Sequence, residues 1–216
     1  MRVQIAPSVL AADFMNLGKD IEMLNNCADV IHLDVMDGTL VPNISFGFSV
    51  IDQLGKIARI PMDAHLMVVH PERWFENLKK DGVSMVSFHY EAAGEDTANH
   101  IETIHSLGMK AGVAINPDMP VETLFPYIGK ADYFLVMSVF AGFGGQKFIE
   151  ESLERVARLR KELDARGYDS IIEIDGGINA GNIKAVKEAG ADLIVAGSSV
   201  FRAEKPEEAV SALRDA

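Results

Sequence analysis

The chain has 216 residues, 48% of them hydrophobic and 24% charged, which is typical of one globular domain with a single substantial core. A formal net charge of -12 without any basic stripe argues against binding to a nucleic-acid backbone, and the lone cysteine, Cys27, excludes an intrachain disulfide and a thiolate metal cluster. The N-terminal apolar stretch is interrupted by Pro7 and Asp13 too early for a signal peptide, and no segment reaches the roughly 20 apolar residues of a membrane span. We therefore expect a cytoplasmic protein that binds neither nucleic acid nor membranes.

Short runs rich in β-branched residues alternate along the whole chain with longer amphipathic segments. The short runs predict strands at residues 2–7, 30–34, 61–66, 85–89, 110–115, 133–137, 171–175 and 193–196. The longer segments predict helices at residues 17–26, 49–58, 71–81, 96–107, 120–129, 149–166, 180–189 and 206–214. Local signals agree with these bounds: prolines suit three first helical turns, at Pro71, Pro120 and Pro206, and Asn179 suits an N-cap. Glycines follow five of the helices, at Gly82, Gly108, Gly129, Gly167 and Gly190.

This alternation of strands and helices favours a barrel. Eight strand–helix units in this length give about 27 residues each, near the lower size limit of a closed (β/α)8 barrel. A doubly wound open sheet usually has fewer strands and a glycine motif after the first strand, where this chain has SVLAADF. No linker or low-complexity segment divides the chain, so we predict one catalytic domain over residues 1–216, a (β/α)8 TIM barrel with parallel strands. Its active site should lie at the carboxyl ends of the strands.

Two histidines and two aspartates stand near the ends of predicted strands: His32, Asp34, His65 and Asp175. His32 and Asp34 are two residues apart, so strand alternation points both side chains to the same side. A set of two nitrogen and two oxygen ligands suits Zn, Fe(II), Mn or Co and disfavours an all-oxygen Mg or Ca site. Each residue alone is more simply a core histidine or a turn aspartate, but their convergence predicts a divalent metal site that contains two acids.

Other polar residues near strand ends have weaker claims. They are Ser8, His89, Asn116, Ser138 and Ser198, and we interpret His89 as a candidate lining residue of the pocket. Three more histidines, His70, His100 and His105, lie on or beside predicted helices and are interpreted as surface residues. In the loop after the second strand, Ser45, Phe46 and Phe48 suit either a subunit contact or a loop folded over its own barrel.

Glycine-rich turns follow the last three predicted strands: AGFGGQ from Ala141, DGGIN from Asp175 and AGSSVF from Ala196. Such turns expose backbone N–H groups, and barrels commonly bind a phosphate at this place, so we predict a phosphate site made largely of amides. Three methionines, Met36, Met67 and Met137, also stand at strand ends. They are either core filler or a polarisable apolar cover over a charged intermediate.

These parts together suit a reaction on a sugar phosphate whose carbonyl and neighbouring hydroxyl oxygens bind the metal. The metal would act as a Lewis acid that eases removal of the α-proton and stabilises the enediolate. One aspartate would remove a proton from one face and the other would return a proton to the opposite face, which inverts one carbon without net redox change. Geometry alone permits either aspartate in either role.

The residues also resemble a known family, ribulose-phosphate 3-epimerase, over essentially the whole length. The matching segments are IAPSVLAADF, IHLDVMDGTLVPNISFG, DAHLMV, MSV followed by GFGGQKF, EIDGGIN and AGADLIVAGSSVF. The resemblance implies interconversion of D-ribulose 5-phosphate and D-xylulose 5-phosphate in the pentose phosphate pathway, with one divalent metal ion per subunit. It implies metal ligation by His32, Asp34, His65 and Asp175, with Asp34 as proton acceptor and Asp175 as proton donor. Barrels of this family tend to associate, so it also implies a homo-oligomer.

The same resemblance implies the substrate-binding residues. Ser8 and His65 would contact the substrate, and Met36, Met67 and Met137 would cover the enediolate. The phosphate would be bound by Gly142, Phe143, Gly144, Gly145, Gly176, Gly177, Gly197 and Ser198.

The chain departs from the family pattern where a polar residue and a proline usually precede GFGGQ, since it has Phe140 and Ala141. We expect the loss of the proline to loosen this turn and to alter substrate affinity or preferred chain length while the chemistry stays intact.

Three other functions compete with this interpretation. A related 3-epimerase acting on D-allulose 6-phosphate would use the same metal and acids. A metal-independent phosphosugar barrel would need a catalytic Lys or Glu at the strand ends, where only Glu173 is available. An inactive phosphate-binding scaffold would be expected to have lost metal ligands, and all four are present.

Overall fold

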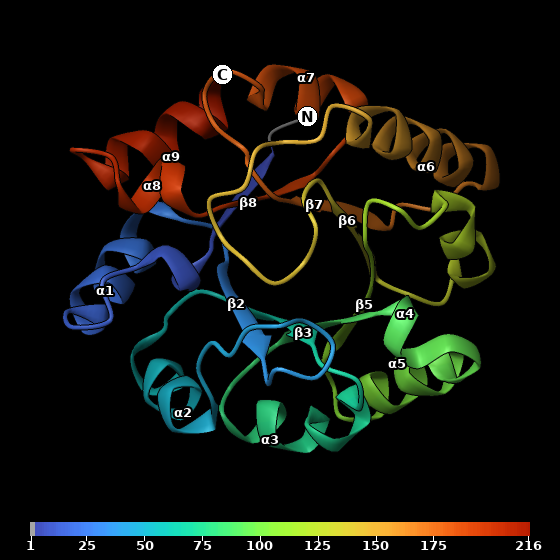
Figure 1. Cartoon of the computed structure of the whole chain (residues 1–216), viewed down its shortest axis with the longest axis horizontal. Coiled ribbons are helices and arrows are strands. Elements are labelled where there is room, and N and C mark those ends of the chain that lie inside the picture. Colours follow the sequence, from blue (N-terminus) through green and yellow to red (C-terminus); the bar gives the residue numbers. More distant parts are fainter. Residues whose placement is uncertain (1–2) are drawn as a thin grey trace.

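The computed structural model describes residues 3–216, which form a barrel of eight parallel strands (Figure 1). The strands are β1 Gln4–Pro7, β2 Ile31–Met36, β3 Met62–Met67, β4 Met85–His89, β5 Lys110–Ile115, β6 Tyr133–Met137, β7 Ile171–Asp175 and β8 Leu193–Ala196. Their order is β1-β8-β7-β6-β5-β4-β3-β2, and the two ends of this order meet through a parallel bridge between Ser8 and His32 and through hydrogen bonds from Asp29 to Ile5. The barrel is therefore nearly closed, and the predicted (β/α)8 fold is confirmed.

The helices lie around the outside of the strands (Figure 1). The α-helices are α1 Leu17–Cys27, α2 Phe48–Ile57, α3 Phe75–Lys80, α4 Tyr90–Ala93, α5 Thr97–Ser106, α6 Ser152–Arg166, α7 Ile183–Ala189, α8 Ser198–Phe201 and α9 Pro206–Asp215. Four 3-10 helices join them within the described residues: η1 Val9–Ala11, η2 Pro71–Arg73, η3 Gly94–Asp96 and η4 Val121–Tyr127. No helix within residues 3–216 has the length and apolar character required to span a bilayer.

Several predicted helix bounds are wrong for local reasons. The segment predicted as a helix at 120–129 is the 3-10 helix η4, which contains Pro126 and therefore lacks a backbone donor there. The helix predicted from residue 149 begins at Ser152, because Ile149 donates its backbone N–H to Ser138 at the end of β6. Asn179 is not the N-cap of α7: its side chain accepts the N–H of Gly181 in a turn, and the cap is Asn182.

Every strand is almost entirely buried, because side chains on one side fill the barrel and those on the other pack under the helices. Gly112 of β5 stands opposite Tyr133 of β6 in the strand register. A Cβ atom at Gly112 would lie 2.3 Å from Cζ of the Tyr133 ring, which occupies the barrel interior. Tyr133 cannot easily move, since its hydroxyl donates to Oδ1 of the buried Asp63 at 2.6 Å.

The substitution Gly112→Ala is therefore expected to lower the free energy of unfolding by about 1–3 kcal/mol, because the interior is already filled. Urea denaturation measures this change. Gly18→Ala is the matched control, because nothing lies within 4 Å of a Cβ at Gly18 and alanine favours the helix there. Equal urea midpoints for Gly112→Ala and the unsubstituted chain would show that the ring has room to yield.

The same pattern of aspartate hydrogen bonds joins three pairs of neighbouring strands at their amino ends. Three aspartates, each preceded by alanine, stand just before β2, β6 and β8, and each binds one residue of the preceding strand twice. Its N–H donates to that residue's carbonyl, and its Oδ2 accepts that residue's N–H. The pairs are Asp29 with Ile5, Asp132 with Ala111, and Asp192 with Ile172. Each Oδ2 also contacts a basic side chain of a helix, from Arg214, His105 and Arg160 respectively.

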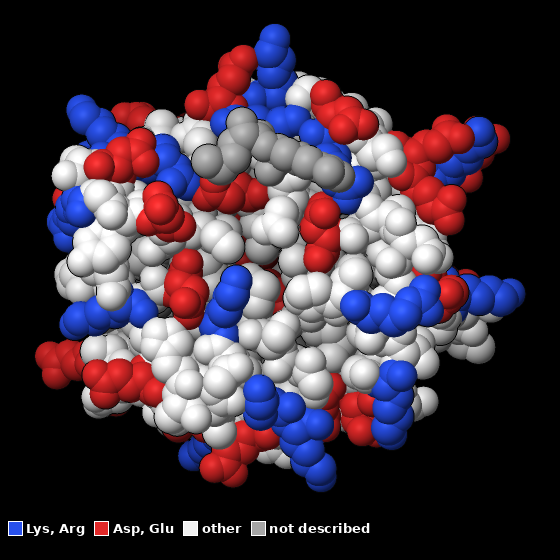
Figure 2. Space-filling view, turned by 180° about the vertical axis from the view of Figure 1, so that it is seen from behind, with Lys and Arg blue, Asp and Glu red and all other residues white. Residues whose placement is uncertain are grey.

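Figure 2 shows the side of the molecule opposite to that of Figure 1. Basic and acidic side chains are interspersed over the coloured part of this face. They do not gather into a continuous basic surface in this view, outside the area covered by the grey atoms.

Candidate active site

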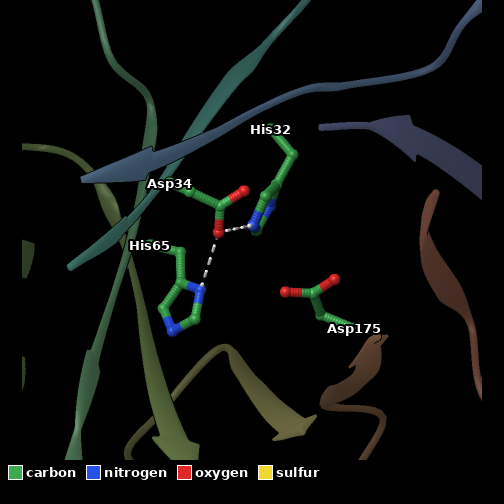
Figure 3. Close-up of side chains that lie close together, drawn as sticks. All are labelled: His32, Asp34, His65 and Asp175. Atoms are coloured by element: carbon green, nitrogen blue, oxygen red, sulfur yellow. Dashed lines mark hydrogen bonds and ion pairs between the residues drawn. The ribbon is translucent and has the colours of Figure 1, made fainter. Parts of the chain in front are cut away.

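Four side chains meet at the carboxyl ends of three strands: His32 and Asp34 from β2, His65 from β3 and Asp175 from β7 (Figure 3). One ligand atom from each lies within 4.8 Å of the others. Nε2 of His32 and Nδ1 of His65 lie 3.4 and 3.3 Å from Oδ1 of Asp34, and Asp175 faces this group across the gap. The four residues that the sequence singled out as metal ligands are thus brought together.

The orientation of His32 fits a metal ligand. Its Nδ1 lies 2.8 Å from Oδ2 of Asp63, whereas its Nε2 is buried without any hydrogen-bond partner. Donation from Nδ1 to Asp63 leaves a lone pair on Nε2 that faces the other three ligands. Asp63 was not singled out from the sequence, although it precedes His65 by two residues on β3 and alternation gives both the same side.

The two carboxyl groups of the cluster differ in their preferred protonation. Burial, followed by repulsion from Asp34, raises the pKa of Asp175 to about 7. Burial also opposes ionisation of Asp34, but the imidazoles of His32 and His65 outweigh it and hold the pKa of Asp34 well below its usual range. Without a metal ion, these surroundings favour the ionised form of Asp34 and the protonated form of Asp175.

The two histidines differ in the same way. Burial lowers the pKa of His65 to about 4, so this ring is neutral at pH 7 and keeps a lone pair. Burial also disfavours charge on His32, but Asp34, Asp63 and Glu173 raise the pKa of His32 well above its ordinary value. Without a metal ion, His32 therefore favours its protonated form, and a divalent cation bound at Nε2 would take the place of that proton.

The cluster lies at the floor of a pocket of about 280 Å³. Its lining includes Asp34 and Asp175 together with most of the predicted substrate-binding residues: Ser8, Met36, Met67, Met137, Gly142, Phe143, Gly144, Gly145, Gly176, Gly177, Gly197 and Ser198. Ser8 also donates its hydroxyl to Oδ2 of Asp34 at 2.6 Å. His65 is fully buried and does not belong to the lining, so the structure does not place it among the residues that a substrate would touch. Arg202 adds a basic side chain to the same pocket.

The sequence matches the family described as "Ribulose-phosphate 3 epimerase family" over residues 4–201. The chain belongs to the ribulose-phosphate 3-epimerase family. A ribulose-phosphate 3-epimerase of Mycobacterium tuberculosis (strain ATCC 25618 / H37Rv) is 44% identical over 210 residues, which are 97% of this chain and 91% of the relative. One from Synechocystis is 42% identical over 218 residues, 99% and 94% of the two chains. The cytoplasmic isoform of Oryza sativa is 43% identical over 216 residues, 98% and 92%.

Solved structures of other enzymes share the fold of this epimerase-family chain. A 3-hexulose-6-phosphate synthase matches with a TM-score of 0.70 at 19% identity, covering 100% of this chain and 99% of the other. The orotidine 5'-phosphate decarboxylase of Pyrococcus horikoshii matches with a TM-score of 0.72 at 16% identity, covering 98% and 97%. These likenesses show the barrel fold alone.

Two glycines allow the loops of the epimerase-family barrel to pack closely at its mouth. Gly176 and Gly177 follow β7 with φ angles of 125° and 65°, which L side chains rarely adopt. A Cβ at Gly176 would lie 2.5 Å from Val139, and one at Gly177 would lie 2.6 Å from the backbone of Phe148. The loop after β6, which crosses the front of the barrel in Figure 1, thus rests directly on the turn after β7.

The methionines of the epimerase-family pocket belong to its wall. Met36, Met67 and Met137 are at most 4% exposed and line the pocket beside Asp34 and Asp175. Their thioethers therefore provide an apolar wall of the pocket that contains the two acids.

The loop at Phe140 and Ala141 is held by hydrogen bonds where the family pattern has a proline. The N–H of Ala141 donates to Oδ1 of Asn116 at 2.9 Å, and Gln146 donates to the carbonyls of Phe140 and Phe143 at 2.7 and 2.8 Å. The N–H that a proline would lack thus anchors this turn, which counts against the expected loosening. The Phe140 side chain is 51% exposed.

Two interpretations of the other histidines need correction. His89 does not line the pocket: it is fully buried, and its Nε2 lies 2.8 Å from Nε2 of His65. His100 is largely covered, because it packs edge-on against Phe75 and Phe88. His70 and His105 are exposed, as predicted for surface residues.

The loop after β2 folds over its own barrel. Ser45 donates to the backbone carbonyl of Asp34 at 2.6 Å. Phe46 is buried beside Phe14, and Phe48 packs on Trp74. Of the two alternatives for this loop, contact within the subunit accounts for these residues.

Proposed function

We propose that this chain catalyses the reversible epimerisation of D-ribulose 5-phosphate and D-xylulose 5-phosphate at C3, a step of the pentose phosphate pathway. One observation carries the proposal: two acidic side chains, Asp34 and Asp175, face each other in a histidine-containing cluster that could hold a metal ion, at the floor of a glycine-lined pocket. An epimerase needs such a pair, because the proton must leave from one face of the carbon and return to the other.

In this mechanism Asp34 removes the proton from C3 of D-ribulose 5-phosphate. The electron pair of the broken C–H bond forms the C2–C3 double bond of an enediolate, and the carbonyl oxygen takes up the negative charge. Asp175 then gives its proton to the opposite face of C3, the carbonyl forms again, and the configuration is inverted. Asp34 ends protonated and Asp175 ionised, so the reverse reaction uses the same groups in exchanged roles. The hydroxyl of Ser8 stabilises the Asp34 carboxylate through its hydrogen bond.

We propose that one divalent ion, Zn, Fe(II), Mn or Co, is bound by His32, Asp34, His65 and Asp175, because this donor set combines nitrogen and oxygen ligands. When bound, the ion supplies Lewis-acid stabilisation of the negative charge that develops on the substrate oxygens. His32, Asp34 and His65 are buried, and the low polarity of these surroundings strengthens charge interactions at the site.

We place the phosphate against the loops after β6, β7 and β8. These loops contribute Gly142, Phe143, Gly144, Gly145, Gly176, Gly177, Gly197 and Ser198 to the pocket lining. Backbone N–H groups of such loops bind anions without basic side chains, and Arg202 adds a positive charge at the rim. The opposite end of the sugar would then lie over the methionines and between the two aspartates.

A coupled assay tests the proposal. Purified protein is given D-ribulose 5-phosphate, and formation of D-xylulose 5-phosphate is followed, with D-allulose 6-phosphate run in parallel. We expect turnover of the pentulose phosphate. Turnover of the hexulose phosphate alone would move the function to D-allulose-6-phosphate 3-epimerase, and turnover of neither would refute a ketose-phosphate epimerase.

The double substitution Phe140→Asn with Ala141→Pro is expected to change KM for D-ribulose 5-phosphate by about 2- to 10-fold, because it removes one hydrogen bond of the phosphate loop, worth about 0.5–1.5 kcal/mol. Steady-state kinetics on pentulose and hexulose phosphates measure the change, and kcat should stay within about 2-fold. Phe140→Asn alone is the control, since it keeps the Ala141 N–H. Identical kinetics for all three proteins on both sugars would contradict a role for this turn in substrate binding.

We further propose that the protein acts in the cytoplasm as a homo-oligomer. A cytoplasmic isoform stands among the relatives, alongside a chloroplastic one from Arabidopsis thaliana. Large apolar side chains are exposed on loops after the strands and suit a subunit contact: Phe14, Met15, Ile44, Val69, Phe140 and Phe143.

A further inference from the structure

A chain of three side chains leads away from the proposed metal site. Nε2 of His65 lies 2.8 Å from Nε2 of His89, and Nδ1 of His89 lies 3.4 Å from Oε2 of Glu91 at the beginning of α4. Both imidazoles are fully buried, and Oε2 of Glu91 is buried without a hydrogen-bond partner. A buried carboxylate oxygen of this kind requires a donor, and His89 is the neighbouring ring that can supply one.

The chemistry of the metal site decides where the protons of this chain lie. To bind the metal ion, His65 must keep Nδ1 unprotonated, because Nδ1 is the ring nitrogen that faces Asp34 and the rest of the proposed metal site. Its proton is then on Nε2, so Nε2 of His89 must accept a hydrogen bond and the proton of His89 must be on Nδ1. That proton points toward Glu91, an acceptor.

Asn116 offers a competing arrangement. Its Nδ2 lies 3.4 Å from Nδ1 of His89, and its Oδ1 is already occupied by the N–H of Ala141. If Asn116 donated to His89, the proton of His89 would move to Nε2 and that of His65 to Nδ1, where it would block the metal. Glu91 favours the first arrangement, in which the proton of His89 is on Nδ1. Although burial opposes its ionisation, contacts with His89 and with the N–H of Asn116 lower the pKa of Glu91 to about 2, so this group only accepts.

We infer that Glu91 is a positioning residue that acts through His89 to fix the tautomer of His65 as a metal ligand. Its other oxygen, Oε1, accepts the backbone N–H of Asn116 at 2.8 Å, so the same carboxylate also supports the residue that anchors the phosphate loop. This inference rests on the proposed function, because it assumes a metal ion at His65.

The substitution Glu91→Gln tests the inference, because the amide can still accept the N–H of Asn116 but turns a donor toward His89. That donor favours the blocked tautomer of His65. We expect Kd for Zn²⁺ to rise about 10- to 100-fold, as is typical when an outer partner of a metal-ligating histidine is lost, with KM at saturating metal within about 2-fold. Asn116→Ala should show the reverse pattern, an unchanged Kd for Zn²⁺ and a raised KM. Glu95→Gln, at an exposed position in η3, is the control.

Histidine ¹⁵N spectra of the unsubstituted Zn²⁺-loaded protein give a second reading that needs no variant. We expect the proton of His65 on Nε2 and that of His89 on Nδ1. A Glu91→Gln protein with the original Kd for Zn²⁺, a loss of metal affinity that Asn116→Ala shares, or a His89 proton on Nε2 would overturn the inference. Failure of the unsubstituted protein to bind metal would instead refute the proposed metal centre, and the inference would fall with it.

Discussion

Replacing Asp175 with asparagine is expected to lower kcat for epimerisation by at least about 10³-fold while the substrate still binds. The amide has the shape of the carboxyl group but cannot give a proton to C3. Steady-state turnover of D-ribulose 5-phosphate, measured with excess divalent metal to offset weakened ligation, provides the comparison. Asp34 and Asp175 are the two carboxyl groups that line the pocket. We therefore expect a larger loss of kcat from Asp175→Asn than from substitution of a residue outside the proposed metal site.

Isotope exchange separates the two aspartates. In D₂O, the Asp175→Asn protein should still exchange the C3 hydrogen of D-ribulose 5-phosphate, because Asp34 can remove the proton and return a deuteron to the same face. It should not exchange that of D-xylulose 5-phosphate, whose C3 proton faces residue 175. Asp34→Asn should show the opposite preference. NMR of the recovered sugars measures both. If Asp175→Asn exchanged the hydrogen of D-xylulose 5-phosphate alone, the proposed roles of the two aspartates would have to be reversed.

Asp169→Asn is the control for these variants. Asp169 is an exposed residue just before β7, so it lies at the other end of the strand that carries Asp175. Its replacement should leave turnover and isotope exchange unchanged. Undiminished turnover in Asp175→Asn itself would show that another group donates the proton.

Removal of the divalent ion is expected to have the second large effect, a loss of activity on the order of 10³-fold. The reason lies in the cluster itself: without a cation, the negative charge that develops on the substrate would face the Asp34 carboxylate in a buried site. Dialysis against a chelator, followed by removal of the chelator and assay, measures the loss.

Metal addition then shows which ions the cluster prefers. Zn²⁺, Mn²⁺, Co²⁺ or Fe²⁺ should restore activity, whereas Ca²⁺ should not, because two of the four ligands are imidazole nitrogens. A matched sample carried through dialysis without chelator controls for loss of folded protein. Full activity after verified removal of all metal would contradict the proposed mechanism.

The strands and the four clustered residues could be predicted from the sequence because they depend on local patterns. Buried parallel strands are continuous apolar runs, and a charged residue at the end of such a run stands out. Asp175 ends β7, whereas His32, Asp34 and His65 lie within β2 and β3, and each stands out as a polar residue in an apolar run. The barrel brings such strands together around one site.

The supporting residues could not be predicted in the same way, because their roles depend on register between strands. Asp63 stands directly opposite His32, and Asp34 opposite His65, only because β2 and β3 pair in one particular register. The link from His65 to Glu91 passes through His89 on a third strand and into α4, a four-residue helix without a periodic pattern. The predicted first residues of α6 and α7 were wrong for a related reason, because Ile149 and Asn179 make hydrogen bonds to loop residues.

The seam between β1 and β2 has a consequence for how the chain is made. Beyond the bridge at Ser8, this seam is joined by Asp29, whose carboxylate binds Ile5 of β1 and the guanidinium of Arg214 in α9. Arg214 follows Asp29 by 185 residues in the sequence. During synthesis the first two strands therefore emerge long before the side chain that binds Asp29, and this part of the barrel can be completed only after α9 has been made.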